Sequence, residues 1–410
     1  DGDGRDPDAS DPGDWVSAAD AATPAFAGCE VRGSSWHGLF IAGQMAATSH
    51  NGLGVAGLHW DGRVLPVRVA GKCGAWVSDL LDGLRWAAGL PVQGLPLNGQ
   101  PARVINLSFG GDAPCSPAYQ QAIDDATQAG ALVVVAAGNA SQGLTRPADW
   151  QRVMAGTSVR QDGAKAAYAS FGAQVALAAP GGSPEGGNAS LLLSTDHGGS
   201  QSPAASVYGF KQGTSFAAPQ AAGVAGLMLA VNPALSPAQL IARMQAGVRP
   251  HAFSASLPLC SAGSPRVCNC TPETCGSDLL DAAQAVQLAT GPAAVIEPLG
   301  SVLPGSRIAL DGRASAAIPG SQIVAYRWAQ LAGPAVALAD AETALAPATP
   351  PLEGRYVFRL QVTDDLGRSA EDSVTVVAAP RESLAAAGES AASGGGGSSV
   401  SSRGSGGSSS

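Results

Sequence analysis

The sequence predicts an α/β domain built on a three-layer, doubly wound parallel sheet, followed by a small all-β sandwich. Residues 1–290 alternate apolar, strand-like runs with helical segments, which indicates parallel strands covered by helices on both faces. From 293 to 378, short alternating runs are separated by Gly, Pro and Asp turns, a pattern typical of a sandwich. Residues 379–410 are rich in Ala, Gly and Ser, so we expect a disordered tail there.

The elements of the first domain follow one another in a regular order. Ser78 is a suitable N-cap for the first expected helix. The most apolar segment, 217–231, contains Pro219 and is too short to span a bilayer, so we interpret it as a buried helix and expect no membrane segment. In order, we expect a strand at 64–69, a helix at 79–89, a strand at 104–109, a helix at 117–129, a strand at 131–137 and a helix at 217–231.

The second domain is expected to be a β-sandwich with a small aromatic and aliphatic core. Val357, Leu360 and Val362 are predicted to form that core together with Trp328. The recognisable strands are expected at 306–310, 323–328, 356–362 and 373–377.

The composition narrows the class of protein. The chain has 410 residues, with 23 basic and 32 acidic side chains and a formal net charge of −9. This balance argues against nucleic acid or an anionic membrane as the partner. Only 13% of the residues are charged and 54 are glycine, which suits a compact extracellular protein with many turns. We expect a monomer.

Seven cysteines are more than a typical cytosolic enzyme carries, and they indicate disulfides. The C-x-C-x4-C spacing of one cluster also permits a zinc site, but the surrounding Ser, Thr, Pro and Gly are typical of a cross-linked loop. Cys73 and Cys115 would form a third bridge, and the partner of Cys29 would precede residue 1. The cluster consists of Cys260, Cys268, Cys270 and Cys275.

The strongest chemical signal is Gly213-Thr-Ser-Phe-Ala-Ala-Pro219, which leads directly into the apolar helix. Its small residues let Ser215 occupy a tight turn with the hydroxyl exposed. The backbone N–H of Ser215 would then lie at a helix N-terminus, where it can donate to a developing oxyanion. An ordinary N-cap serine gives the same local pattern, so the motif alone does not decide between the two.

Two more residues complete a possible constellation. His37 precedes the small-residue segment Ile41-Ala-Gly-Gln-Met-Ala-Ala47, a setting that none of the other four histidines shares. Asn139 follows an apolar strand through Gly138, which places a side-chain amide at the end of a buried strand. Taken singly, a structural histidine and a turn asparagine are the ordinary interpretations.

Four ordered motifs together resemble a known family. They are His37-Gly38, Asn106-Leu-Ser-Phe-Gly110, Ala136-Ala-Gly-Asn139 and the segment around Ser215. They resemble the subtilisin-like serine peptidases (subtilases), particularly secreted bacterial members, over residues 1–290. The resemblance implies a protein or peptide substrate, with Ser215 as nucleophile, His37 as general base and acid, and Asn139 as side-chain oxyanion donor.

The resemblance also assigns the substrate contacts. Two backbone edges would pair with an extended peptide, and a third segment would line the pocket for the residue before the scissile bond. The edges are Gly74, Ala75 and Trp76, and Ser108, Phe109 and Gly110; the pocket segment is Ala136, Ala137 and Gly138.

The sequence departs from the family pattern in two respects. Subtilases carry the triad aspartate in an Asp-Thr-Gly or Asp-Ser-Gly segment before the histidine, and no such segment lies between Asp1 and His37. We therefore expect that aspartate upstream of residue 1, and weak or absent activity in the chain alone; a triad that uses one of the loop carboxylates is the other interpretation. Leu39 and Phe40 replace Thr and His of the family motif, and Gln220 stands where His is frequent, which predicts altered packing near the site.

The acidic opening is a candidate calcium site. Its carboxylates alternate with Gly and Pro, and hard oxygen ligands on a flexible turn suit Ca²⁺. Subtilisin-like peptidases often bind calcium for stability, which favours this interpretation over a solvated acidic loop. The predicted ligands are Asp3, Asp6, Asp8 and Asp11.

The second domain also resembles a known type. Trp328 and the run from Tyr356 to Asp365 resemble the polycystic-kidney-disease-type (PKD-like) β-sandwich, which commonly follows secreted bacterial hydrolases. We interpret this domain as a spacer, with binding of insoluble protein or polysaccharide as the alternative.

These observations predict a bacterial serine endopeptidase, secreted and extracellular or at the cell surface, that acts through an acyl-enzyme on Ser215. The alternative is a catalytically impaired, protease-like module that binds peptides or a surface. A lipase or esterase is disfavoured because Gly-x-Ser-x-Gly is absent around Ser215.

Overall fold

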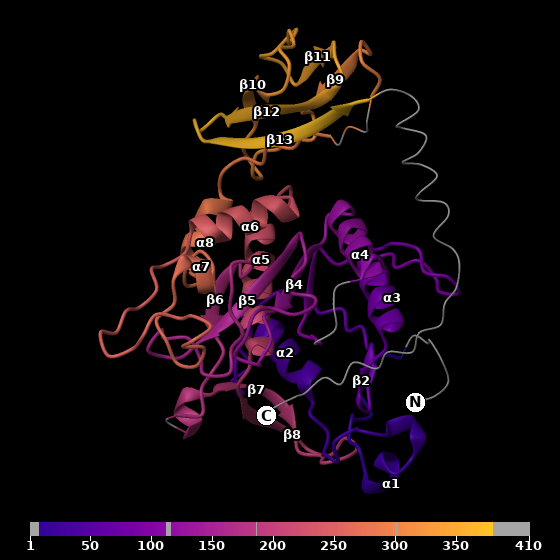
Figure 1. Ribbon diagram of the computed structural model, residues 1–410, viewed down its shortest axis with the longest axis vertical. Coiled ribbons are helices and arrows are strands. Elements are labelled where there is room, and N and C mark those ends of the chain that lie inside the picture. Colours follow the sequence, from indigo (N-terminus) through magenta and orange to yellow (C-terminus); the bar gives the residue numbers. More distant parts are fainter. Residues whose placement is uncertain (1–7, 112–115, 186, 298, 300–301, 380–410) are drawn as a thin grey trace. The chain divides into compact units, whose positions relative to one another are not determined.

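The computed structural model describes residues 8–111, 116–185, 187–297, 299 and 302–379 of the chain (Figure 1). Contacts between Cα atoms divide these residues into two units. One contains the residues up to 227 together with 237–286, and the other contains 228–236 and the residues from 287 onward. Each unit has its own apolar core.

The first unit is built on a four-stranded parallel sheet with the strand order β3-β4-β5-β6. All five residues of β4 are buried, which is expected for a strand that helices cover on both faces. This sheet confirms the predicted parallel α/β architecture. The strands are β3 (Val104–Leu107), β4 (Leu132–Ala136), β5 (Val153–Val159) and β6 (Leu177–Pro180).

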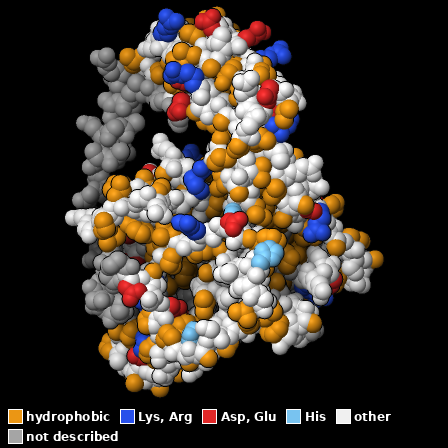
Figure 2. All heavy atoms as spheres, turned by 180° about the vertical axis from the view of Figure 1, so that it is seen from behind, with side chains coloured by type: hydrophobic (Ala, Val, Ile, Leu, Met, Phe, Trp, Pro, Cys, Tyr) orange, Lys and Arg blue, Asp and Glu red, His pale blue; other side chains and the backbone are white. Residues whose placement is uncertain are grey.

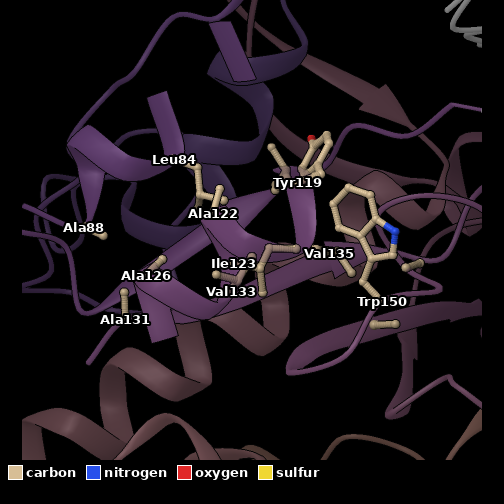
Figure 3. Packing of buried hydrophobic residues seen from close by; sticks show 13 residues of the cluster. Leu84, Ala88, Tyr119, Ala122, Ile123, Ala126, Ala131, Val133, Val135 and Trp150 are labelled. Carbon is tan, nitrogen blue, oxygen red and sulfur yellow. The ribbon is translucent and has the colours of Figure 1, made fainter. Parts of the chain in front are cut away.

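Helices cover both faces of this sheet and complete three layers. On one face, α3 (Val77–Ala87) and α4 (Pro117–Gln128) pack side by side over an apolar cluster that includes Ala155 of β5 (Figures 1 and 3). On the other face lies α5 (Thr214–Val231), since a Cβ on Gly156 of β5 would lie only 3.6 Å from the Cα of Ala218. Successive strand residues point to opposite faces, so Ala155 and Gly156 contact different layers.

The first cluster contains one close aromatic pair. The rings of Tyr119 and Trp150 lie 3.9 Å apart between centroids, and Ile123 packs beside them with no exposed surface (Figure 3). Burial raises the pKa of the Tyr119 phenol to about 12. This packing fixes α4 against the sheet.

The apolar helix α5 has the length and hydropathy that a membrane span would need, but 61% of that window is buried inside the protein. Ala217, Ala218, Ala221 and Ala225 are almost without exposed surface, which is the environment of a core helix. The predicted buried helix is therefore confirmed, although it begins earlier, at Thr214.

The remaining elements of the first unit lie around this core. The helix α2 (His37–Ala46) packs against the antiparallel hairpin of β7 (Leu192–His197) and β8 (Ser206–Lys211). The other elements are α1 (Ala18–Ala21), η1 (Pro24–Phe26), β1 (Ala70–Gly71), β2 (Gly74–Ala75), η2 (Gly187–Ser190), α6 (Pro237–Ala246), α7 (Pro272–Cys275) and α8 (Ala282–Ala289).

Two local predictions for the first unit are wrong. The segment 64–69 is not a strand, because within the described residues it has no strand partner; Val67 and Val69 pack instead against Gly83 of α3. The helix predicted at 79–89 begins at Val77, with Trp76 as its N-cap, so Ser78 lies inside the helix and does not cap it. The helix predicted at 117–129 is confirmed as α4.

The structure confirms the prediction that the cysteines form disulfides, but it corrects one of the predicted pairs. Cys29 is bonded to Cys73, so the predicted bridge from Cys73 to Cys115 is wrong, and Cys29 has its partner within this sequence. Cys115 lies outside the described residues. The clustered cysteines form the pairs Cys260–Cys268 and Cys270–Cys275, which leaves no free thiolate there for zinc.

The second unit contains two antiparallel sheets, and Trp328 lies in the core between them. The strand β11, which pairs with β9, was not predicted from the sequence. The sheets, in strand order, are β10-β12-β13 and β11-β9, with bounds β9 (Ile308–Asp311), β10 (Ile323–Ala332), β11 (Leu345–Ala348), β12 (Gly354–Asp364) and β13 (Ser369–Ala378).

The predicted core of this unit is wrong at one position. Residues of even number from 356 to 364 along β12 are buried, including Tyr356, Phe358, Leu360 and Val362, whereas Val357 points to the other face. Side chains alternate along a strand, so Val357 cannot share a face with Leu360. The predicted tail at 379–410 lies outside the described residues, apart from Ala379.

Charged side chains are sparse and interspersed on the face shown in Figure 2. Blue and red side chains alternate among large orange and white areas, and the described residues of this face form no extended basic patch. This distribution agrees with the low fraction of charged residues, 13%.

Candidate active site

His37 is the first residue of α2, and the turn before it is unusual. Trp36 adopts a left-handed conformation (φ 48°), and its indole N–H donates to Gly199 O at 2.7 Å. A non-glycine residue in this conformation is strained and needs support from its surroundings. The turn that presents the imidazole is therefore held by the β7–β8 connection.

The residue before this tryptophan is held from two sides. The carboxylate of Asp14 accepts hydrogen bonds from the backbone N–H and the hydroxyl of Ser35, and it also pairs with Arg32 at 2.9 Å. On the opposite side, Lys211 Nζ donates to Ser35 O at 2.6 Å and to Asp196 Oδ1 at 3.0 Å. Two charged groups thus fix the peptide that leads into His37.

The imidazole of His37 is held in its neutral form. Burial is the main cause and the nearby Lys211 ammonium the next; together they lower the pKa of His37 to about 4, although Asp14 acts in the opposite direction. Burial disfavours the charged form of a histidine, and a neighbouring cation adds to this effect. A neutral imidazole is the form that can accept a proton from a serine hydroxyl.

Ser215 lies in the first turn of α5, two residues after a glycine that the backbone requires. Gly213 has φ +148°, a conformation that side-chain-bearing residues rarely adopt. The Ser215 hydroxyl donates to Ser108 O at 3.4 Å, and the Ser108 hydroxyl donates back to Ser215 O at 2.8 Å. The end of β3 and the start of α5 are therefore joined at the candidate nucleophile.

The side chain of Asn139 is fixed by its oxygen. Its Oδ1 accepts hydrogen bonds from the backbone N–H of Thr214 at 3.0 Å and from the Thr214 hydroxyl at 2.9 Å, while that hydroxyl accepts from Gly138 N at 3.1 Å. Among the described residues, the amide Nδ2 of Asn139 has no hydrogen-bond acceptor. Asn139 is thus anchored to Thr214, the residue that precedes Ser215, and both of its amide hydrogens are free to donate.

The helices of the histidine and the serine pack against each other. The His37 ring lies 5.4 Å from the Phe216 ring and 6.1 Å from that of Phe109, between centroids. Phe40, one turn further along α2, lies 4.7 Å from Phe216, and Gln44 Nε2 donates to Phe216 O at 3.1 Å. In the part of the chain that the structure describes, His37 makes no hydrogen bond to Ser215. The contact between their two helices is made by the ring of Phe216, which packs against His37 and Phe40.

Two of the three altered family positions, Phe40 and Gln220, take part in this packing. Phe40, which replaces the usual histidine, has no exposed surface and forms a small cluster with Ile41 and Phe216. Leu39 points outward, with 38% of its surface exposed. Gln220 donates from Nε2 to Phe216 O at 3.0 Å.

The segments predicted to bind substrate begin or end secondary-structure elements. Gly74 and Ala75 form β2, a two-residue strand paired with β1, and Trp76 follows with 48% of its surface exposed. Ser108, Phe109 and Gly110 directly follow β3. Ala136 ends β4, followed by Ala137 and then by Gly138 with φ +106°.

The structure describes only half of the predicted calcium ligands. Asp3 and Asp6 lie outside the described residues. Asp8 Oδ1 accepts a hydrogen bond from Ser10 N, and these contacts with Ser10 lower the pKa of Asp8; Asp11 Oδ1 accepts from Gly13 N. Within the described residues, the carboxylates form no group of three or more close enough to share an ion.

Three residues at the site were not predicted from the sequence. Asp14 and Lys211, which hold the Ser35 peptide, are separated in sequence from it by 21 and 176 residues. Thr214 anchors Asn139, and its place within the Gly-Thr-Ser motif was an available signal. Asp14 is one of the loop carboxylates between Asp1 and His37, but nothing local singles it out, and nothing local links Lys211 to His37.

The amino-acid sequence of this chain matches models of two known families. A sequence model of the subtilase family (Peptidase S8) matches residues 6–255, and a PKD domain model matches residues 301–378. The first match covers more than half of the chain.

Two curated relatives are similar over the first unit. The extracellular protease of Xanthomonas campestris is 43% identical over 241 residues, and the extracellular basic protease of Dichelobacter nodosus is 41% identical over 246 residues. Each alignment covers 58% of this chain, and the chain spans about 40% of the length of each relative.

A solved structure agrees with these matches. A protease from Pseudoalteromonas arctica is 40% identical, with a TM-score of 0.62, over 70% of this chain and 80% of that structure. This similarity confirms the predicted fold class. The chain therefore belongs to the subtilase family and carries a PKD-type domain after its peptidase unit.

Proposed function

We propose that this chain is the catalytic part of a secreted bacterial serine endopeptidase, which cleaves peptide bonds in proteins through an acyl-enzyme on Ser215. The observation that carries the proposal is the anchoring of Asn139. Its Oδ1 is bonded to both donors of Thr214, the residue before Ser215 at the start of α5, so Nδ2 is directed away from that anchor. An amide donor next to a helix-terminal N–H can stabilise an oxyanion.

The chemistry assigns one task to each residue. His37, neutral in its partly buried position, accepts the proton as Ser215 Oγ attacks the substrate carbonyl, and it later returns the proton to the leaving amine. Asn139 Nδ2 and the Ser215 N–H donate to the carbonyl oxygen as it becomes negatively charged. For the attack, Ser215 Oγ exchanges its present acceptor, Ser108 O, for the imidazole.

The triad carboxylate is the part that the described residues do not contribute. Asp14 is the carboxylate whose charge acts on His37, but it is bonded to Ser35 and Arg32 and not to the imidazole. We propose that an aspartate from a strand before residue 1 contacts His37 in the full-length protein. A carboxylate there would raise the pKa of the imidazole from its low value and fix its tautomer.

An extended substrate would lie between two backbone edges. We propose that Gly74–Trp76 and Ser108–Gly110 pair with its main chain, while Ala136, Ala137 and Gly138 line the pocket for the side chain before the scissile bond. Main-chain pairing explains how such an enzyme could accept many sequences. Trp76 has 48% of its surface exposed.

The remaining assignments belong to the same proposal. The enzyme is secreted as a monomer, in keeping with relatives named extracellular proteases, and its domains span residues 1–290 and 293–378. Subtilases generally bind structural calcium; we propose Asp3, Asp6, Asp8 and Asp11 as ligands in this protein. The PKD-type domain acts as a spacer.

The test is the hydrolysis of casein by the full-length protein, with its Ser215→Ala variant as the matched control. The proposal predicts hydrolysis by the wild type and a loss of about six orders of magnitude in kcat on removal of the serine, a magnitude taken from subtilisin, a member of this family. Equal rates for the two proteins would refute the proposal and favour a binding module.

A further inference from the structure

Two oxyanion donors in the proposed site belong to segments that are far apart in the sequence, one around Asn139 and the other around Ser215. Each segment contains a glycine in a conformation that favours glycine, Gly138 with φ +106° and Gly213 with φ +148°. Glycine gives the backbone more freedom than any other residue. The bonds between Asn139 and Thr214 link the two segments directly, and a further restraint on their separation would act beside these bonds.

The segment from Ala167 to Phe171 holds the Asn139 side. Ser170 N donates to Gly138 O at 2.8 Å, just before Asn139, and Ser141 N donates to Tyr168 O at 2.8 Å, just after it. The hydroxyl of Ser141 also donates to Ala167 O. These bonds bracket Asn139 on both sides.

The same segment reaches the Ser215 side through one hydroxyl. Tyr168 Oη accepts a hydrogen bond from Gly213 N at 3.1 Å, two residues before Ser215, and the same N–H is shared with Gly181 O at 2.9 Å. It also donates toward the carbonyl oxygens of Gly181 and Gly182, at 2.7 and 2.8 Å. Burial raises the pKa of this phenol to about 12, so it remains protonated and can donate and accept at the same time.

We propose that Tyr168 is a positioning residue that holds the two oxyanion donors at a fixed separation, its main chain tied to the Asn139 loop and its hydroxyl tied to Gly213. This inference rests on the proposed peptidase function. Tyr168 acts through Asn139 and Ser215, so it should contribute to stabilisation of the transition state and little to binding of the substrate ground state.

The experiment compares Tyr168→Phe with Tyr208→Phe in the full-length protein. Tyr208 lies on β8 with 48% of its surface exposed, which makes it a matched control. For each variant we measure the kinetics of hydrolysis of a peptide amide and the affinity for a peptide boronate. The adduct of the boronate with Ser215 places an oxygen in the oxyanion site. We expect Tyr168→Phe to lower kcat and boronate affinity about tenfold with KM within twofold, and Tyr208→Phe to match the wild type.

A double-mutant cycle separates this role from general destabilisation. In an Asn139→Ala background, the cost of Tyr168→Phe should fall to threefold or less, because one of the two positioned donors is already absent. The same tenfold loss in both backgrounds, or a wild-type kcat in Tyr168→Phe, would overturn the proposal.

Two further measurements keep the result decisive. If Tyr168→Phe does not fold, Ser141→Ala is used instead, because it removes the neighbouring hydrogen bond from the Ser141 hydroxyl to Ala167 O. A lower kcat at unchanged KM supports the proposal, and unchanged kinetics oppose it. Failure of the peptidase function itself would appear differently, as equal rates for the wild type and Ser215→Ala.

Discussion

Lys165 is a buried cation without a carboxylate partner among the described residues. Its side chain has no exposed surface, and Nζ donates to Ala166 O at 2.9 Å and Ala169 O at 2.7 Å, with the Phe171 ring 5.2 Å away. Burial lowers the pKa of this ammonium from 10.5 to about 8. Carbonyl oxygens compensate only part of the hydration that a charged group loses.

This shift has a defined consequence for stability. Between pH 8 and 10.5 the unfolded chain keeps its proton on Lys165 while the folded chain releases it, so the free energy of unfolding rises with pH in this window. A shift from 10.5 to 8 corresponds to about 3 kcal/mol in total, since each pH unit contributes about 1.4 kcal/mol. Below pH 8 this gain is absent.

The assay is chemical unfolding at pH 7.5, 8.5 and 9.5 in a Ser215→Ala background, which prevents self-digestion. Lys165→Met keeps the length of the side chain and removes the charge, so the rise assigned to Lys165 should disappear. Lys72→Met is the control, because Lys72 is partly exposed and paired with Asp20 at 2.8 Å, and it should keep the rise. The same pH dependence in Lys165→Met and the wild type would refute the reasoning.

Three other predictions follow from the site and the cross-links. Replacing Asn139 by Ala should lower kcat about 10²- to 10³-fold with little change in KM, a range measured in subtilisin of this family; steady-state kinetics check it, and a loss confined to KM would contradict the assigned role. Because the Lys211 ammonium is one cause of the lowered pKa of His37, Lys211→Met should move the acidic limb of the kcat/KM profile to higher pH, and a shift to lower pH would contradict this. Replacing both Cys29 and Cys73 by Ser should lower the free energy of unfolding by about 4 kcal/mol for this separation of 44 residues, as measured by urea unfolding; an unchanged stability would contradict the pairing.

Much of the fold was readable from local patterns. The apolar run at 131–137 contains the buried strand β4, and the run at 217–231 is most of α5. Both could be predicted because the pattern of apolar residues that indicates a strand or a helix extends over only a few adjacent residues. The face of Val357 was also readable: it is three residues from Leu360, so alternation places the two on opposite faces, and the prediction misapplied this rule.

Other features depend on partners far along the chain. The segment 64–69 has a strand-like sequence, yet without a neighbouring strand in the described residues it packs as an irregular segment against α3. The choice of Cys73 as the partner of Cys29 likewise required the path of the intervening chain. Neither outcome is encoded in the residues next to these positions.

The sequence by itself determined which chemical groups the protein carries and which motifs hold Ser215, His37 and Asn139, because helix ends, strand ends and tight turns are specified by a few adjacent residues. Only the tertiary structure decided how these groups are supported: Asn139 anchored to Thr214, and Lys211 bonded to a peptide 176 residues away. The physical reason is that such contacts depend on how the whole chain closes its loops around the core, and no local pattern records that closure.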